Sequence, residues 1–487
     1  MVGGNARKKE EEVGLDTMGS QQDGEKDRGD EVRSLDDLQE LAGSTGRWNL
    51  TVIVLACFCT FTTLLNGLAY QFLGATPNYW CHMVPLVEAN WTDEEIINFA
   101  IPSSSDRNMT ENWSSCQIYD YNYTLAVQLG YQESVNNNRL FPKVGAPVTS
   151  CTSRDFNRTH YQSTIVTEWD LVCSRRALYS TTQAMVSIGD FIGSLVFGCL
   201  IEEIGRRRSM LLASAMAFVT GMVAAFSPTL YFYMVMRILI STFTIATDIV
   251  CVILCLEICS PKYRSHVGSL YSIPWALGYM MLPGLAYLVR DWQMLQIALT
   301  IPNVFSIIYI WTLPESPRWL VVHGKKEEAL KVLTKAASVN GKTLPPEKDM
   351  LAAMDRINQK NTRKECEKEV GLWRQMVGKV QWFTAPLILP NLRKVALPVL
   401  FCWITTSMIY FGVSFSAINL SMNLYVYIFL GGLLEIPALL ILWPMSIHLG
   451  RRKSMMFLFL VCAFTFLLIM LQQICIPDGQ RLGRGCR

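Results

Sequence analysis

Long apolar runs alternate with short polar segments along most of this chain. Nine of the runs are long enough to cross the hydrocarbon core of a bilayer as a helix, which takes about 20 residues. The predicted spans are 51–72, 179–201, 210–226, 230–258, 267–289, 295–313, 395–416, 424–447 and 455–476. The pattern therefore predicts an all-α protein that crosses a membrane several times.

Basic residues follow the runs at regular places. Lys or Arg comes after the second, fourth, sixth and eighth predicted spans, and such residues are retained on the cytoplasmic side. Two of these loops carry nearly the same phrase, GRRRSM at 205–210 and GRRKSM at 450–455. The charges predict a cytosolic N-terminus, and the repeated phrase predicts two related halves, as in many secondary transporters.

Composition agrees with a membrane protein. Apolar residues make up 51% of the 487 residues, more than an ordinary soluble domain carries. The formal net charge of +3 gives no reason to expect a nucleic-acid partner. Residues 1–48 are polar and lack the apolar core of a cleavable signal peptide, so we predict a disordered cytosolic N-terminus.

The segment 73–178 is the one long loop predicted on the outer side. Its five N-x-Ser/Thr sequons indicate glycosylation at Asn90, Asn108, Asn112, Asn122 and Asn157. Its four cysteines are Cys81, Cys116, Cys151 and Cys173. An even set in an oxidising compartment favours two disulfides over four free thiols, and all three connectivities stay open.

The other predicted segments follow from the runs. Residues 49–313 form an N-terminal half with six spans, and 314–393 form a cytosolic linker that opens with two prolines. Residues 394–476 form a partial second half with three spans, and 477–487 form a polar tail. An odd number of spans places this basic tail outside, against the charge rule, so the sequence predicts a C-terminally truncated chain.

The sequence shows no phosphate-binding glycine loop, nucleophile elbow or His-x-x-x-His pair, so we predict no enzyme, cofactor or metal site. Ionisable residues inside predicted spans are therefore the best candidates for a site, because each is costly in a bilayer. They are Asp190, Asp248, Glu435 and Arg237. Three acids against one base favour a cation, a zwitterion or a coupling proton over an anion. The alternative is that Arg237 pairs with one acid and only locks helices together.

Aromatic side chains supply a second set of candidates, because a ring face attracts a cation. The candidates are Tyr233, Trp275, Tyr279, Trp403 and Tyr410. Trp403 and Tyr410 are seven residues apart and share a helix face, so we rank this pair first. The alternative is anchoring at the membrane interfaces, where Trp and Tyr are also enriched.

The basic loops predict an inner gate. We expect Arg206 and Arg207 to pair with Glu202, and Arg451 and Arg452 to pair with helix ends of the first half. Glu257, at the cytoplasmic end of its span, is the predicted further member, and Arg237 is assigned to the same gating set. The alternative is a solvated loop that only fixes topology.

Several of these residues resemble a known motif. The set Gly198, Glu202, Glu203, Gly205, Arg206 and Arg207 resembles the first loop motif of the major facilitator superfamily, with Glu203 in place of the usual base. Residues 163–173 (STIVTEWDLVC), 314–320 (PESPRWL), 410–412 (YFG) and 433–437 (LLEIP) resemble solute carrier family 22, the organic cation, anion and zwitterion transporters. The likeness extends from about residue 35 to 460 and is strongest to the cation and carnitine members.

This resemblance implies a major facilitator-type helical bundle that works by alternating access in the plasma membrane. Family members have twelve spans, six in each half, so only about three helices of the second half are expected here. The implied substrates are small organic cations or carnitine-like zwitterions, bound by Asp248, Glu435, Trp403, Tyr410 and Asp190 in a cavity that the seventh span lines.

A coupling ion (sodium or a proton) and a homo-oligomer are left open, and the lipid membrane is the expected surrounding. Two alternatives remain, a truncated regulatory form that does not transport, and an organic anion or sugar carrier. Substrate charge stays undecided, because in this family the eleventh span helps to set it.

Overall fold

The computed structural model describes residues 35–43, 46–103, 114–143, 145–366, 389–415 and 423–475. Within these ranges, eight helices are long and apolar enough to cross a membrane. They are Arg47–Leu73, Cys173–Ile204, Arg206–Ala225, Leu230–Ile258, Trp292–Thr312, Pro390–Tyr410, Leu424–His448 and Arg452–Leu471. Each coincides with one of the nine predicted spans.

The remaining predicted span, 267–289, is not one helix. It is divided into α12 (Pro261–Leu270) and α13 (Ile273–Leu288), with the break at Tyr271 and Ser272. A proline in the first turn of α13 explains the break, because proline lacks the N–H that a continuous helix would need there. The break leaves α13 with 16 residues.

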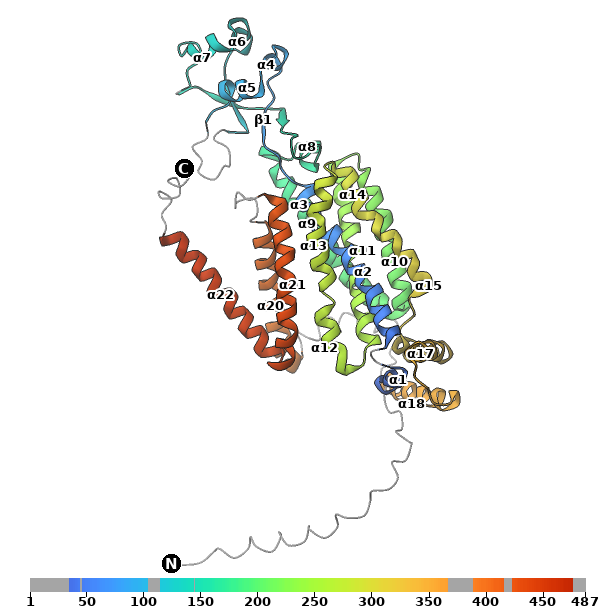
Figure 1. Ribbon diagram of the computed structural model, residues 1–487. Helices are drawn as coiled ribbons and strands as arrows, with labels where there is room; N and C mark the ends of the chain where they lie inside the picture. The colour runs from blue at the N-terminus through green and yellow to red at the C-terminus, as the bar shows by residue number, and fades with distance from the viewer. Residues whose placement is uncertain are drawn as a thin grey trace, which may run out of the picture.

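The next predicted span is also irregular. It consists of α14 (Trp292–Thr300), a 3-10 segment (Ile301–Ile308) and α15 (Tyr309–Thr312). These elements pack with α2 (Arg47–Leu68), α3 (Tyr70–Leu73) and α10 (Arg206–Ala225), and α10 in turn contacts α9 (Arg176–Ile204) and α11 (Leu230–Ile258). Together with α12 and α13 they form what we call the first group of helices (Figure 1).

Two glycines allow α9 and α11 to pack closely. A Cβ atom added at Gly189 would lie 2.4 Å from the Ile238 carbonyl oxygen, and one at Gly193 would lie 2.4 Å from that of Thr242. The Thr242 hydroxyl donates a hydrogen bond to the Gly189 carbonyl oxygen at 3.1 Å. Small residues at such crossings are typical of helices packed in membranes.

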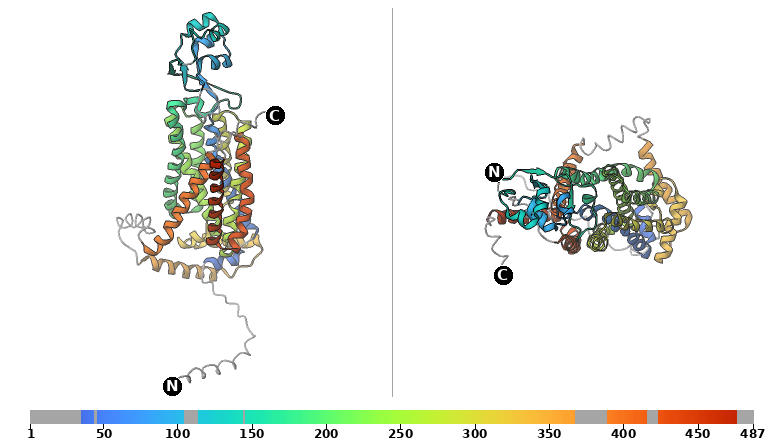
Figure 2. Two further views of the ribbon diagram at one scale, coloured as in Figure 1. Left: turned by 90° about the vertical axis from the view of Figure 1, so that its left-hand side faces the viewer. Right: turned by 90° about the horizontal axis from the view of Figure 1, so that it is seen from above.

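The second group of helices contains α20 (Pro390–Phe415), α21 (Leu424–His448) and α22 (Arg451–Cys475). It stands along one side of the first group and meets it mainly where α21 crosses α13 (Figures 1 and 2). At the crossing, a Cβ added at Gly432 would lie 2.9 Å from the Met280 backbone nitrogen and 3.1 Å from the Ala276 carbonyl oxygen.

We expect Gly432→Ala to weaken this contact by about 1–3 kcal/mol, the usual cost of forcing an extra group into a packed interior. Thermal unfolding of the purified protein in detergent measures the effect. Gly284→Ala on α13 is the control, because a Cβ there meets nothing within 4 Å. Equal melting temperatures for both variants would contradict the prediction.

The outer loop folds into a small domain of its own (Figure 1). Two antiparallel pairs form it, β1 (Tyr79–Cys81) with β4 (Arg154–Phe156) and β2 (Gln117–Tyr119) with β3 (Val148–Ser150). Its helices are α4 (Val84–Glu88), α5 (Asp93–Ala100), α6 (Tyr123–Leu129) and α7 (Tyr131–Asn136), and α8 (Ile165–Trp169) precedes the 3-10 turn Cys173–Arg175. Disulfides join Cys81 to Cys151 and Cys116 to Cys173, one of the three open connectivities.

The ends of the helices opposite the outer domain carry α16 (Pro317–Val322), α17 (Lys326–Asn340) and α18 (Glu347–Cys366). Helix α1 (Leu35–Ala42) docks against α17, although the sequence predicted disorder throughout 1–48. Leu38 is buried there, and the Asn340 side chain donates hydrogen bonds to the carbonyl oxygens of Ala42 (2.9 Å) and Gly43 (3.1 Å). Asp36 forms an ion pair with Arg264 at 2.6 Å. These contacts order α1, and residues 1–34 lie outside the described part.

Candidate functional site

A cavity of about 600 Å³ lies between the two groups of helices. Ser272 and Trp275, at the α12–α13 break, form one side of it, while Glu435, Met445 and aliphatic residues of α21 and α22 form the other. The volume lies within the range typical of small-molecule sites, which are mostly apolar with a few polar groups.

Among the residues that the structure describes, Glu435 is the only acid that lines this cavity. It lies near the middle of α21, and the Tyr410 hydroxyl of α20 donates a hydrogen bond to its Oε1 at 3.4 Å. The Trp275 side chain is within hydrogen-bonding reach of the same hydroxyl. The structure thus brings together a carboxylate and two aromatic residues that the sequence had named separately.

Trp403 does not join this cluster. Its side chain is 70% exposed, and α20 is exposed along most of its length. Trp403 and Tyr410 therefore do not share a cavity-lining face in the structure. Trp275 is instead the tryptophan that lines the cavity with Glu435. Tyr279 packs in the α13–α21 crossing, where a Cβ at Gly431 would lie 3.2 Å from its ring.

Asp248 lies on α11 and does not line the cavity. Its Oδ1 accepts hydrogen bonds from the hydroxyls of Thr60 on α2 (3.2 Å) and Tyr271 at the helix break (3.1 Å). The carboxylate therefore ties together α2, α11 and the start of α13. This geometry fits a residue that positions the break beside Ser272 and Trp275.

Asp190 and Arg237 lie within the first group of helices. Asp190 accepts a hydrogen bond from the Ser241 hydroxyl across the α9–α11 contact. Arg237 is 2% exposed and stacks on the Tyr70 ring, with 5.6 Å from its Cζ to the ring centroid. Among the described residues, Nε and Nη2 of Arg237 have no hydrogen-bond partner. Neither residue lines the cavity.

A charge network joins the end of α9, the start of α10 and the end of α11. Arg206 is only 4% exposed. Its guanidinium donates to both carboxylate oxygens of Glu257, at 2.9 and 2.8 Å, and to those of Glu202, at 2.8 and 3.3 Å. Bidentate pairs of this kind are the stronger class of hydrogen bond and fix the relative orientation of the helices.

Sequence reasoning missed Glu315, which completes the network. Its carboxylate accepts hydrogen bonds from the backbone N–H groups of Arg206 (2.8 Å) and Arg207 (3.1 Å) at the start of α10. An anion is favoured at a helix N-terminus, where these N–H groups lack partners. Gly205 has φ +100°, and a Cβ there would lie 2.6 Å from Glu315 Oε2, so glycine is required. An acid in the PESPR phrase was the available signal.

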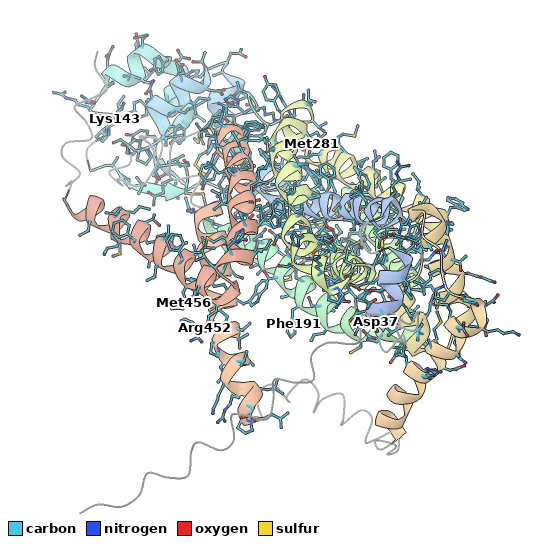
Figure 3. The ribbon with its side chains drawn as sticks, turned by 60° about the horizontal axis from the view of Figure 1, so that its bottom comes forward. Asp37, Lys143, Phe191, Met281, Arg452 and Met456 are labelled. Atoms are coloured by element: carbon cyan, nitrogen blue, oxygen red, sulfur yellow. A yellow bond between two sulfur atoms is a disulfide. The ribbon has the colours of Figure 1, made fainter. Side chains whose placement is uncertain are left out.

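The predicted clasp between the two halves is absent from the described contacts. All the partners of Arg206 belong to the first group or to the segment that follows it. Arg207 donates to the Ile310 carbonyl oxygen. Arg452 is exposed at the start of α22, well apart from Asp37 on α1 (Figure 3), and no ion pair is described for it. The side chain of Arg451 lies outside the described part.

Three of the five predicted glycosylation sites lie in the described part of the outer domain. Asn90 and Asn122 are exposed, and Asn157 is half-buried, with its Oδ1 accepting a hydrogen bond from the Thr159 backbone N–H at 2.9 Å. Asn108 and Asn112 lie outside the described residues.

Known proteins resemble the chain over most of its length. Residues 117–483 match the family described as "Sugar (and other) transporter". The "Organic cation transporter protein" of Drosophila melanogaster is 30% identical over 418 residues, which are 86% of this chain and 72% of the relative. "Solute carrier family 22 member 3" of Mus musculus is 30% identical over 416 residues, 84% of this chain and 71% of the relative.

Among solved structures, one of the proton:xylose symporter XylE is 14% identical to this chain, with a TM-score of 0.45, over 84% of this chain and 69% of that chain. The family match and the two relatives identify the chain. It belongs to the sugar (and other) transporter family of the major facilitator superfamily, and within it to solute carrier family 22, whose members are multi-pass membrane transporters.

Proposed function

We propose that this chain carries small organic cations across the plasma membrane by alternating access, with Glu435 as the charged group of the site. The observation that carries the proposal is a single carboxylate on a largely apolar cavity between the two groups of helices. Rocking of the groups around such a site would expose it to each side in turn.

The electrostatics of the cavity favour a cation. Glu435 is hydrogen-bonded by a neutral tyrosine, and no basic residue of the described part of the chain lines the cavity, so a bound cation would supply the missing charge. Trp275 presents an aromatic ring beside it, which adds attraction for an ammonium group. A carnitine-like zwitterion is less favoured, because its carboxylate would face aliphatic side chains and the Ser272 hydroxyl alone.

Uptake of radiolabelled tetraethylammonium into liposomes that contain only the purified chain tests the proposal. We expect saturable uptake that unlabelled cations inhibit. Trp275→Ala should lower the apparent affinity about fivefold, because a cation–π contact that stays in contact with solvent contributes about 1 kcal/mol. Trp403→Ala is the matched control, since this tryptophan is 70% exposed and should leave uptake unchanged.

Binding of the same cation without uptake would contradict transport and support a non-transporting, regulatory form. Uptake of organic anions or xylose in place of cations would contradict the assignment of Glu435.

A further inference from the structure

Tyr425, at the outer end of α21, is surrounded by aromatic rings. Its ring centroid lies 5.2 Å from that of Phe72 on α3, 5.8 Å from that of Tyr287 on α13 and 6.3 Å from that of Tyr161 in the outer loop. The three neighbours all belong to the first group or its loop, whereas Tyr425 belongs to the second group. This cluster is therefore a contact between the two groups at the outer face.

The contact continues one turn further along α21. Ile428 is fully buried and packs in the same apolar core as Tyr233 and Trp292 of the first group. The cavity at Glu435 comes two turns later in α21, on the cytoplasmic side of Tyr425. In this conformation the packed rings lie between the cavity and the outer ends of the helices.

Tyr161 belongs to the outer loop that carries the sequons, and contacts with Arg290 hold this part of the loop against the first group. The backbone N–H groups of Gln162 and Ser163 donate to the Arg290 carbonyl oxygen, at 3.0 and 3.4 Å. The Arg290 guanidinium donates to the Thr159 carbonyl oxygen at 3.4 Å and stacks on Tyr287, with 5.2 Å to the ring centroid. The segment 159–163 is thus fixed to the end of α13, and its tyrosine reaches across to the second group.

We propose that Phe72, Tyr161, Tyr287 and Tyr425 form the outer gate of the transport path. The end of the outer loop is then a working part of the gate, since Tyr161 must separate from Tyr425 before the cavity can face outward. The inference rests on the proposed alternating access, and its test is chosen to read the gate without measuring transport.

Opening the gate breaks the three ring contacts of Tyr425. Each aromatic pair favours the closed state beyond its buried area, so their loss should shift the population toward the open state about tenfold. Tyr425→Phe keeps the ring and should shift it little, whereas Tyr425→Ala and Tyr161→Ala should both favour opening. A tyrosine that only anchors α21 would give no such effect at position 161.

Accessibility of a cysteine in the cavity measures gate opening. Ser272→Cys is labelled in intact cells with a membrane-impermeant methanethiosulfonate, and the same protein with native Ser272 gives the background from other thiols. We expect about tenfold faster labelling when Tyr425→Ala is added, and about threefold when Tyr161→Ala is added, because the second variant removes one of the three ring pairs. Tyr231→Ala, a tyrosine 71% exposed on the outer end of α11, is the matched control and should not change the rate.

A second variant does not depend on the folding of the alanine proteins. Tyr161→Cys combined with Tyr425→Cys, oxidised to a disulfide, should lock the gate and prevent both labelling of Ser272→Cys and tetraethylammonium uptake. Unchanged labelling in the oxidised protein would overturn the gate. An effect at Tyr425 but not at Tyr161 would overturn the role of the loop. Absence of uptake in every protein, with labelling still gated, would refute the proposed function and leave the gate standing.

Discussion

Replacing Arg206 with glutamine is expected to lower the maximal rate of transport at least about tenfold while the apparent affinity for substrate changes little. The variant leaves the carboxylates of Glu257 and Glu202 together at these helix ends without the buried guanidinium that pairs with both. Breaking a buried ion pair costs about 3–5 kcal/mol, so the first group should also lose stability. Substrate binding should be spared, because neither Glu435 nor Trp275 contacts the network.

Initial rates of cation uptake over a range of concentrations separate the two parameters, and thermal unfolding gives the stability. Arg208→Gln is the matched control, because Arg208 is exposed and has no described ion pair. Arg206→Lys should give an intermediate result, since lysine keeps the charge but loses the bidentate geometry. A loss of affinity as large as the loss of rate would contradict the gating role.

Glu435→Gln is expected to reduce uptake of organic cations about tenfold to a hundredfold. The substitution keeps the shape of the side chain and removes the one charge that the described residues place on the cavity wall. A hydrogen bond to a charged group contributes about 1.5–3 kcal/mol, which corresponds to this range in affinity. The loss should appear as a higher substrate concentration at half-maximal uptake.

Glu435→Asp keeps the carboxylate but shortens the side chain, so it tests whether substrate binding depends on the charge alone or also on its position. This variant should retain part of the uptake. Tyr410→Phe removes a long hydrogen bond of 3.4 Å and should cost only a few-fold. If Glu435→Gln transported normally while Asp248→Asn did not, the substrate charge would be bound at Asp248 instead. The structure favours Glu435 as the group that binds the substrate charge, because the Asp248 carboxylate already accepts hydrogen bonds from Thr60 and Tyr271.

The spans could be predicted because a bilayer demands about 20 apolar residues for each crossing, a signal visible without any tertiary information. The break at Tyr271 was missed although Pro274 was in view, since the apolar run continues across it. Helix α1 was missed for another reason. Half of its eight residues are polar, and contacts from distant residues, above all Asn340, stabilise it.

Some residues of the candidate site could likewise be predicted from the sequence, and others could not. Glu435 and Tyr410 could be found from type and depth alone, because charges within spans are few. Whether Trp275 or Trp403 faces the cavity depends on how each helix is rotated against its neighbours, and the spacing of residues within one helix does not determine this. The pairing of Arg206 with Glu257 could be predicted from their opposite charges. Glu315 was missed because it accepts hydrogen bonds from backbone N–H groups, which an inspection of charged side chains does not consider.

The two disulfides also set an order for biosynthesis. Cys81 and Cys151 are 70 residues apart, and both have been made before Cys173, which must wait for the start of α9. The Cys116–Cys173 bond therefore cannot form until the whole loop has been synthesised, and all five sequons precede Cys173 in the chain. Addition of sugars can thus precede this closure, and a cell deprived of oxidising equivalents should accumulate glycosylated chains whose outer domain is still open.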